Sequence, residues 1–244
     1  METKDVLEAL LAILEEKKRK DIYEAIERFK KERITELKND RTHKNPFIQG
    51  PKVVLHLIPY ESFQNYYDFD FADYLGNYQA IRPIRFGSLD QSFGFEGLLH
   101  FANGRENKCV SYVQVYRNGI IEAVDAHEFN TEEKVIYSKN LEEKLIERAN
   151  QYMAFQKEIG VNPPVFFYLS LLGVRDFRMP RIPGHDFFDN IHAIDKEDLI
   201  FPKITLNKPA LTPEEFKPIF DRLWNACGYP RCPDYDDKGI WKKK

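Results

Sequence analysis

Apolar residues recur at spacings of three and four along the first 38 residues, which predicts one long helix. No glycine or proline interrupts this stretch before Pro46. The repeat consists of Val6, Leu10, Ile13, Ile22, Ile26 and Phe29. Because such an apolar face needs a partner, we expect residues 1–40 to form a helical segment that docks on the main body, on another protein or on a second copy of the chain. Residues 41–244 then form an α+β domain.

Short runs of β-favouring residues predict a mainly antiparallel sheet in that domain. Residues 53–58 (VVLHLI) and 165–174 (VFFYLSLLGV) are apolar on both faces, which is typical of buried strands. Between them, the dipeptide Asn118-Gly119 separates two β-rich runs and predicts a hairpin with a type I′ turn. Residues 95–102 are expected to add a third strand, so that the three form an antiparallel meander.

A two-residue turn at this hairpin would also fix its register. It pairs Val115 with Glu122 and makes Arg117 the diagonal neighbour of Glu122. The face that carries Glu122 would then also carry Val113, Val115, Ile120 and Val124. If this face is buried, we expect a structural ion pair between Glu122 and Arg117. The alternatives are that the face meets solvent or that Glu122 is an active-site carboxylate.

Two further helices have recognisable ends. Asn140 and Glu143 form a capping-box pattern at the start of the first, and Gly160 marks its end. The second is announced by Thr212-Pro213-Glu214-Glu215, with a capping residue, a proline in the first turn and a glutamate three positions after the cap.

The segment between residues 175 and 210 is irregular and rich in proline. Long structured loops in compact domains often carry function, so a site is expected there. Residues 199–206 (LIFPKITL) are expected to form an edge strand, because Pro202 lacks the N–H that a central strand needs. The sequence thus predicts an α+β fold with a mainly antiparallel sheet, covered by helices and preceded by a helical segment.

Composition narrows the classes of function. The chain has 244 residues, 43% of them hydrophobic, and a formal net charge of −3, so it has no overall electrostatic attraction to nucleic acid or to an anionic membrane. The three cysteines are too few and odd in number for a disulfide framework, which favours a reducing compartment. No apolar run approaches the roughly 20 residues of a membrane span, and the first residues lack a signal-peptide core. We therefore expect a cytoplasmic location and no membrane partner.

The motifs of the common enzyme classes are absent from the sequence. It contains no P-loop, GxGxxG, GxSxG, HExxH or paired CxxC pattern, so no cofactor is predicted. Cys227 and Cys232 lack the further ligands that a structural zinc site needs, so no metal site is predicted from them. The weak catalytic candidates are Glu122, Asp125, Asp176 and His185. If they met, they could bind a divalent metal in a nuclease or phosphohydrolase.

Arginines and one tryptophan are the candidates for binding a ligand or nucleic acid. The candidates are Arg117, Arg175, Arg178, Arg181 and Trp241. Trp241 precedes three lysines, and an aromatic ring with lysines can bind a single strand. Three aspartates just before it nearly cancel that charge, so a solvated tail with the ring packed down is the alternative.

Five segments resemble a known family when they are taken together and in order. They are PKVVLHLIPYESF, FGFEGLLHF, SYVQVYRNGIIEAVDA, VFFYLSLLGVRDF and RLWNACGYPRCPDYDDKGIW. They are similar to the C-terminal region of bacterial and archaeal proteins with a Schlafen-type AlbA_2 domain, which are described as DNA-binding, ATP-binding or transcriptional-regulator-like. The similarity covers residues 22–241.

The resemblance implies an association with nucleic acid but carries no catalytic residue. In that family the AlbA_2 domain precedes this region, whereas the roughly 50 residues before VVLHLI predict a helix here. The chain is then either a freestanding relative of the C-terminal region or a part of a longer protein. The resemblance implies a non-catalytic binding or sensory module of nucleic-acid-acting, regulatory or defence-related proteins. The alternative is the metal-dependent nuclease or phosphohydrolase.

Overall fold

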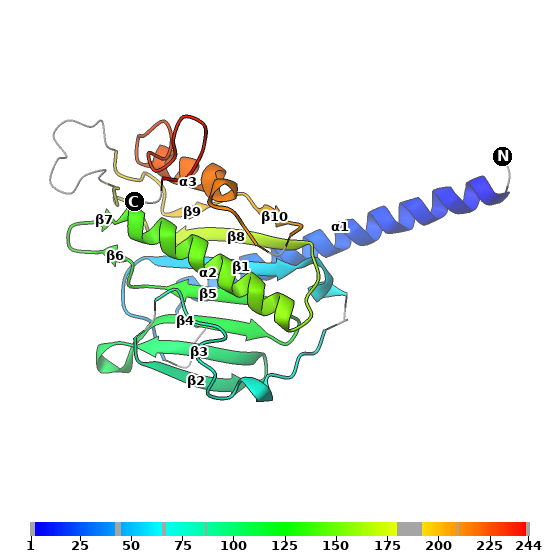
Figure 1. The fold of residues 1–244 in the computed structure, drawn as a ribbon, viewed down its shortest axis with the longest axis horizontal. Coiled ribbons are helices and arrows are strands. Elements are labelled where there is room, and N and C mark those ends of the chain that lie inside the picture. The colour runs from blue at the N-terminus through cyan, green and yellow to red at the C-terminus, as the bar shows by residue number, and fades with distance from the viewer. Residues whose placement is uncertain are drawn as a thin grey trace.

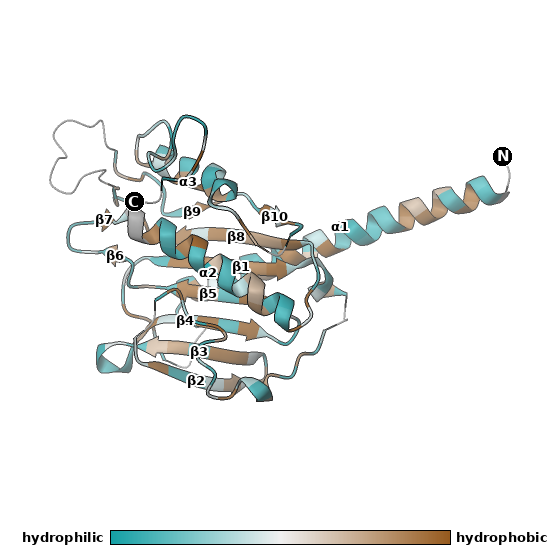
Figure 2. Cartoon of the chain, in the orientation of Figure 1, coloured by the Kyte–Doolittle hydropathy of each residue, from teal (hydrophilic) through white to brown (hydrophobic). Residues whose placement is uncertain are grey.

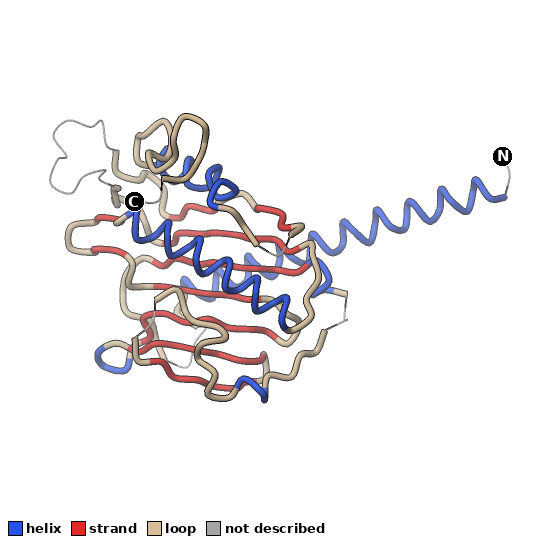
Figure 3. Tube along the Cα trace, in the orientation of Figure 1, coloured by secondary structure: helices blue, strands red, loops and turns tan. Residues whose placement is uncertain are grey.

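A computed structural model describes residues 3–41, 45–64, 67–85, 87–179, 192–208 and 210–242, and it shows an α+β fold (Figure 1). A large antiparallel sheet forms the middle layer. The helices α2 (Ser138–Glu158) and α3 (Pro213–Ala226) cover one face, and the helix α1 (Thr3–Lys38) lies on the other (Figure 3). The predicted fold class is confirmed.

The sheet is ordered β10-β8-β1-β5-β4-β3-β2, and β9 also pairs with β8. Its strands are β1 (Lys52–Pro59), β2 (Leu89–Gly94), β3 (Gly97–Asn103), β4 (Cys109–Tyr116), β5 (Ile121–Asp125), β8 (Val165–Leu172), β9 (Asp198–Ile200) and β10 (Ile204–Leu206). A separate small sheet pairs β6 (Phe129–Asn130) with β7 (Val135–Ile136). Short 3-10 helices occupy Tyr60–Phe63, Ala72–Tyr74 and Arg105–Asn107.

Both faces of the central strands are buried, as their sequences predict. Every residue of β1 and of β8 is buried, because these strands are neighbours in the sheet and helices cover both of its faces. The predicted meander of β3, β4 and β5 is also confirmed. The predicted edge strand at 199–206 is divided, with β9 and β10 pairing with different parts of β8 on either side of Pro202.

The predicted register of the β4–β5 hairpin was wrong by one residue. Of the two turn residues, only Gly119 has a positive φ, of 83°. Tyr116 N donates to the carbonyl oxygen of Ile120 at 2.8 Å, so the loop has three residues and Gly119 takes the left-handed position of a bulged turn. Glu122 therefore lies opposite Gln114 rather than Val115. A shift of one residue moves Glu122 to the other face of the sheet, toward α1.

The helix ends follow the sequence with one correction. α2 begins at Ser138, three residues before the predicted start, and Tyr137 rather than Asn140 occupies its capping position. Gly160 follows its last turn with a φ of 89°, as expected. α3 has the predicted capping box, in which Thr212 N donates to the Glu215 carboxylate at 2.8 Å.

The two halves of α1 have different surroundings. Residues 22–38 pack on the sheet, where Ile22, Ile26 and Leu37 are buried. The preceding turns extend beyond the body of the protein (Figure 1). We call residues 3–21 the arm and residues 22–38 the root of α1.

Candidate functional site

The arm exposes an apolar stripe to solvent. Its large apolar side chains retain between 38% and 62% of their accessible surface, and they are Val6, Leu7, Leu10, Leu11, Ile13 and Leu14. Spacings of three, four and seven place them along one side of the helix. The apolar turns stand out on the distal part of the arm in Figure 2. A contiguous exposed patch of this kind marks an interaction surface more often than single exposed apolar residues do.

Charge is unevenly distributed along the arm. Residues 3–16 contain one lysine and four acidic residues, a net charge of −3, whereas residues 17–20 are Lys-Lys-Arg-Lys, a net charge of +4. The apolar stripe thus lies in an acidic segment and ends at a basic run. A pocket of about 400 Å³ lies where the arm leaves the body, between Leu14, Ile22 and Phe63.

The root is held on the sheet by aromatic and aliphatic packing. Phe29 makes edge contacts with His56 and Tyr116, with ring centroids 6.1 and 5.5 Å apart. Ile26 is fully buried in the same cluster. This packing fixes the direction in which the arm leaves the body.

A buried polar cluster connects the root to the middle of the sheet. The Glu122 side chain is fully buried, and its carboxylate accepts hydrogen bonds from Arg33 Nε at 3.0 Å and Arg33 Nη2 at 2.8 Å. His56 Nε2 lies 2.9 Å from Glu122 Oε2, and the Tyr112 hydroxyl donates to Oε1 at 2.5 Å. We call these four residues the anchor. A two-pronged arginine–carboxylate pair is strong and geometrically specific, so the anchor sets the position of α1 on the sheet.

Charge compensation keeps the anchor ionised. Burial alone would raise the pKa of Glu122, but the Arg33 guanidinium and the hydrogen bonds from His56 and Arg33 hold that pKa well below its ordinary value. Burial opposes the charge of Arg33, yet the Glu122 carboxylate raises the pKa of Arg33 far above its ordinary value. Loss of either partner would leave an uncompensated charge in the buried site and would destabilise the fold.

The predicted ion pair between Glu122 and Arg117 was wrong, because the register shift removes Arg117 from the neighbourhood of Glu122. The Arg117 guanidinium instead donates to the carbonyl oxygens of Phe69, at 3.1 Å, and Phe95, at 3.2 Å. It lines a surface pocket of about 630 Å³ together with Tyr67. Arg117 thus holds two loops at one end of the sheet.

The described catalytic candidates do not meet. Asp125 is buried on the face of the sheet opposite to Glu122, where it accepts a hydrogen bond from His127 N at 2.8 Å. Burial raises the pKa of Asp125 to about 7, and the neighbouring Glu128 adds to the shift. Asp176 lies at the surface and pairs with Lys134 at 2.9 Å. The fourth candidate, His185, lies outside the described residues.

Two of the predicted binding residues, Arg117 and Arg175, lie at opposite ends of the sheet. Arg175 is exposed and pairs with Glu197 at 3.3 Å, near the end of β8, and the strand register places this end opposite to the hairpin of Arg117. The backbone of Arg178 bonds to Lys134 and Ile136, and Arg181 lies outside the described residues.

The ring of Trp241 packs down rather than standing free. Its centroid lies 4.9 Å from that of Tyr235 and 6.1 Å from that of Phe220, and the ring is half-buried. This agrees with the alternative in which the C-terminal tail is solvated and its tryptophan is packed against the body.

Sequence reasoning found the arm but not its exposed stripe. The predicted apolar repeat placed Val6, Leu10 and Ile13 on one face together with the apolar residues of the root. In the structure only the residues of the root are covered. Leu7, Leu11 and Leu14 repeat at spacings of four and three and widen the apolar face of the arm. This local excess of leucine over the first 14 residues was the available signal.

Comparison with protein-family models, curated proteins and solved structures finds no match to this chain. The resemblance to the C-terminal region of AlbA_2-containing proteins stays a prediction from the sequence. Within the described ranges, every helix is too short or too polar to cross a bilayer.

Proposed function

We propose that the protein is a non-catalytic binding module that assembles by pairing its arm with the arm of a second copy. The observation that carries the proposal is the exposed apolar stripe on a helix whose root is fixed to the body. The sequence resemblance supports placing this module beside nucleic-acid-acting proteins. It adds no catalytic residue.

A second copy is the occupant that suits the stripe best. Two paired helices meet through apolar residues that recur every three or four positions. The stripe has this spacing, with Leu7 and Leu14 seven residues apart and Leu10 or Leu11 between them. A two-fold pair uses the same patch on both chains, so each stripe would be covered by one of equal length and character. Pairing removes from water a surface that each isolated arm leaves exposed.

Charge and shape favour an antiparallel pair. In a parallel pair the two Lys-Lys-Arg-Lys runs would lie side by side and repel each other. In an antiparallel pair the basic run of each arm lies toward the acidic first turns of the other, which contain Asp5 and Glu8. The antiparallel arrangement also places the two bodies at opposite ends of the pair, because the body lies at the C-terminal end of the arm (Figure 1).

The anchor supports this function by fixing the arm before it binds. A short isolated helix is marginally stable in water, and ordering it on binding lowers the affinity. The arm instead continues a helix whose root is held by the pair of Arg33 with Glu122.

The metal-dependent hydrolase receives no support from the described candidates. Glu122 serves the anchor on one face of the sheet, and Asp125 lies on the other face. A single metal ion cannot bind both.

The double variant Leu10→Glu/Leu14→Glu tests the proposed pairing. It places charge in the middle of the stripe and is expected to raise the dimer dissociation constant at least about 100-fold, or about 2.7 kcal/mol. Sedimentation velocity and light scattering over a range of protein concentrations measure the effect. The melting temperature of the body should stay the same, because both leucines are exposed in the single chain.

A matched control adds the same charge to the other side of the arm. Ala9→Glu/Ala12→Glu changes two exposed residues of the same turns and should leave dimerisation intact. The pairing is ruled out if the native protein stays monomeric at high micromolar concentration, or if both double variants weaken association equally.

A further inference from the structure

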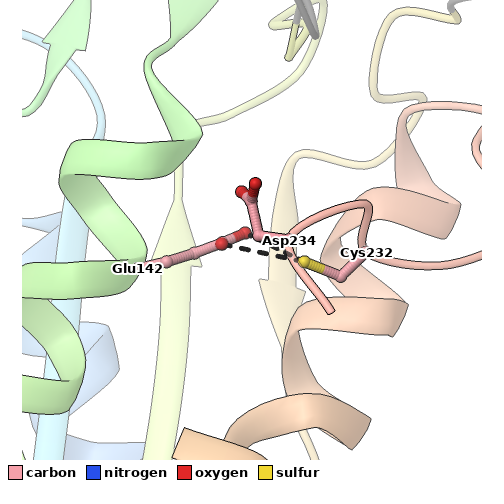
Figure 4. Close-up of side chains that lie close together, drawn as sticks. All are labelled: Glu142, Cys232 and Asp234. Carbon is pink, nitrogen blue, oxygen red and sulfur yellow. Dashed lines mark hydrogen bonds between the residues drawn. The ribbon is translucent and has the colours of Figure 1, made fainter. Parts of the chain in front are cut away.

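The C-terminal segment brings a thiol and a carboxylate to a buried carboxylate of α2. Glu142 and Cys232 are buried, and Asp234 is partly buried beside them (Figure 4). One ligand atom from each of the three residues lies within 4.8 Å of the other two. We call these residues the Glu142 cluster. It lies on the face of the sheet opposite to the anchor and shares no residue with the arm.

The spacing of the donor atoms suits a small cation. Cys232 Sγ lies 3.6 and 3.7 Å from the two carboxylate oxygens of Glu142. With zinc–sulfur bonds of about 2.3 Å and zinc–oxygen bonds of about 2.0 Å, a tetrahedral site separates sulfur from oxygen by about 3.5 Å. Sulfur and oxygen therefore already lie near the spacing that a tetrahedral zinc site needs.

Neighbouring groups hold the donors in place. Trp224 Nε1 donates to Glu142 Oε1 at 2.7 Å, and the backbone N–H of Cys232 donates to the Asp221 carboxylate at 2.9 Å. Hydrogen bonds of this kind orient ligands around protein metals. They come from α3, so α2, α3 and the C-terminal segment all contribute to the same position.

Burial opposes negative charge on two of the three donors, Glu142 and Cys232. Burial raises the pKa of Glu142 to about 8 and also raises the pKa of the Cys232 thiol. A dication at this position would neutralise the charges that burial opposes. The donor set of one sulfur and two carboxylates favours zinc over magnesium or calcium, which prefer oxygen alone.

We propose that Glu142, Cys232 and Asp234 bind one Zn²⁺ ion, which ties the C-terminal segment to α2. Three protein ligands leave the fourth tetrahedral position for water. Binding forms one zinc–sulfur and two zinc–oxygen bonds and releases the proton of the Cys232 thiol to solvent, because the thiolate is the metal ligand. The sequence predicted no metal site from Cys227 and Cys232, and the structure places Cys232 beside Glu142, 90 positions away in the chain.

Cobalt titration of the full chain tests the site, because Co²⁺ occupies zinc sites and absorbs in the near ultraviolet when a thiolate binds it. We expect this charge-transfer band to saturate at one equivalent of Co²⁺ and to disappear on addition of Zn²⁺. Cys232→Ser should abolish the band, and Asp234→Asn should weaken Co²⁺ binding at least about 10-fold. Cys227→Ala removes a buried thiol outside the cluster and should keep the band.

A stability measurement makes the test independent of the spectrum. Zn²⁺ should raise the melting temperature of the native protein and of Cys227→Ala, but not that of Cys232→Ser. Circular dichroism establishes that each variant is folded before titration. The proposal is overturned if the folded native protein gives no thiolate band, or if the band survives in Cys232→Ser. Either result leaves the proposed arm pairing untouched, because the stripe and the cluster are separate.

Discussion

Glu122→Gln is expected to lower the free energy of unfolding by about 3 to 5 kcal/mol at neutral pH. The substitution keeps the size of the side chain but removes the charge that compensates Arg33 in a buried site. It also replaces one of the two acceptor oxygens by an amide nitrogen, which cannot accept the hydrogen bonds that Arg33 and either His56 or Tyr112 make to that oxygen. The loss should be concentrated where α1 meets the sheet.

Urea denaturation of the variant measures this loss directly. Glu36→Gln is the matched control, because Glu36 is the exposed partner of the same arginine, at 2.5 Å from Arg33 Nη1. Exposed ion pairs contribute little, so this control should change the stability by less than about 0.5 kcal/mol. A change below about 1 kcal/mol in Glu122→Gln would show that the anchor does not hold α1 in place.

Arg33→Met is expected to reverse the pH dependence that Glu122 contributes to stability. In the native protein the folded pKa of Glu122 lies below its unfolded value, so its stabilising effect is present above about pH 4.3 and is lost as the pH falls. Burial is already the largest single influence on this pKa, and without Arg33 the main interaction that offsets it is lost, so the folded pKa rises above the unfolded value. The variant should then be most stable in mild acid and lose stability as the pH rises toward neutrality.

The expected loss for Arg33→Met at pH 7 is about 3 to 5 kcal/mol relative to the native protein, because an uncompensated carboxylate remains buried. At pH 4.5 the difference should be smaller by at least about 1 kcal/mol, since protonation of Glu122 then costs little. Denaturation curves at both pH values supply the comparison. Arg28→Met, which changes an exposed arginine of the same helix, should parallel the native protein at both. An equal loss at the two pH values in Arg33→Met would contradict the role assigned to Glu122.

The helices and strands could be predicted from the sequence because the signals that mark them lie within a few neighbouring residues of the chain. The capping box of Thr212 and Glu215 and the apolar runs of β1 and β8 are of this kind. The hairpin register was not predictable from Asn118-Gly119 alone, since the dipeptide suits both a two-residue and a three-residue loop. The choice depended on whether Asn118 adopts a positive φ, and it does not.

The partners of the buried acids could not be predicted from the sequence. Glu122 binds Arg33, 89 positions away, and the hairpin suggested Arg117 only because it was near in the chain. Many arginines and lysines occur in the helical segment, and packing of the root on the sheet selects one of them. The same holds for Glu142 and Cys232, which meet only when the C-terminal segment folds back on α2.

Hydrogen exchange of the arm amides as a function of protein concentration tests the pairing of the arms most directly. In a single chain residues 7–16 are an exposed part of α1 whose amides open to solvent more readily than covered ones, whereas pairing covers this segment. We expect the protection of residues 7–16 to increase with protein concentration in the native protein and in Ala9→Glu/Ala12→Glu, and to stay low in Leu10→Glu/Leu14→Glu. Exchange that is fast and independent of concentration in the native protein would contradict the proposal that a second copy covers the apolar stripe.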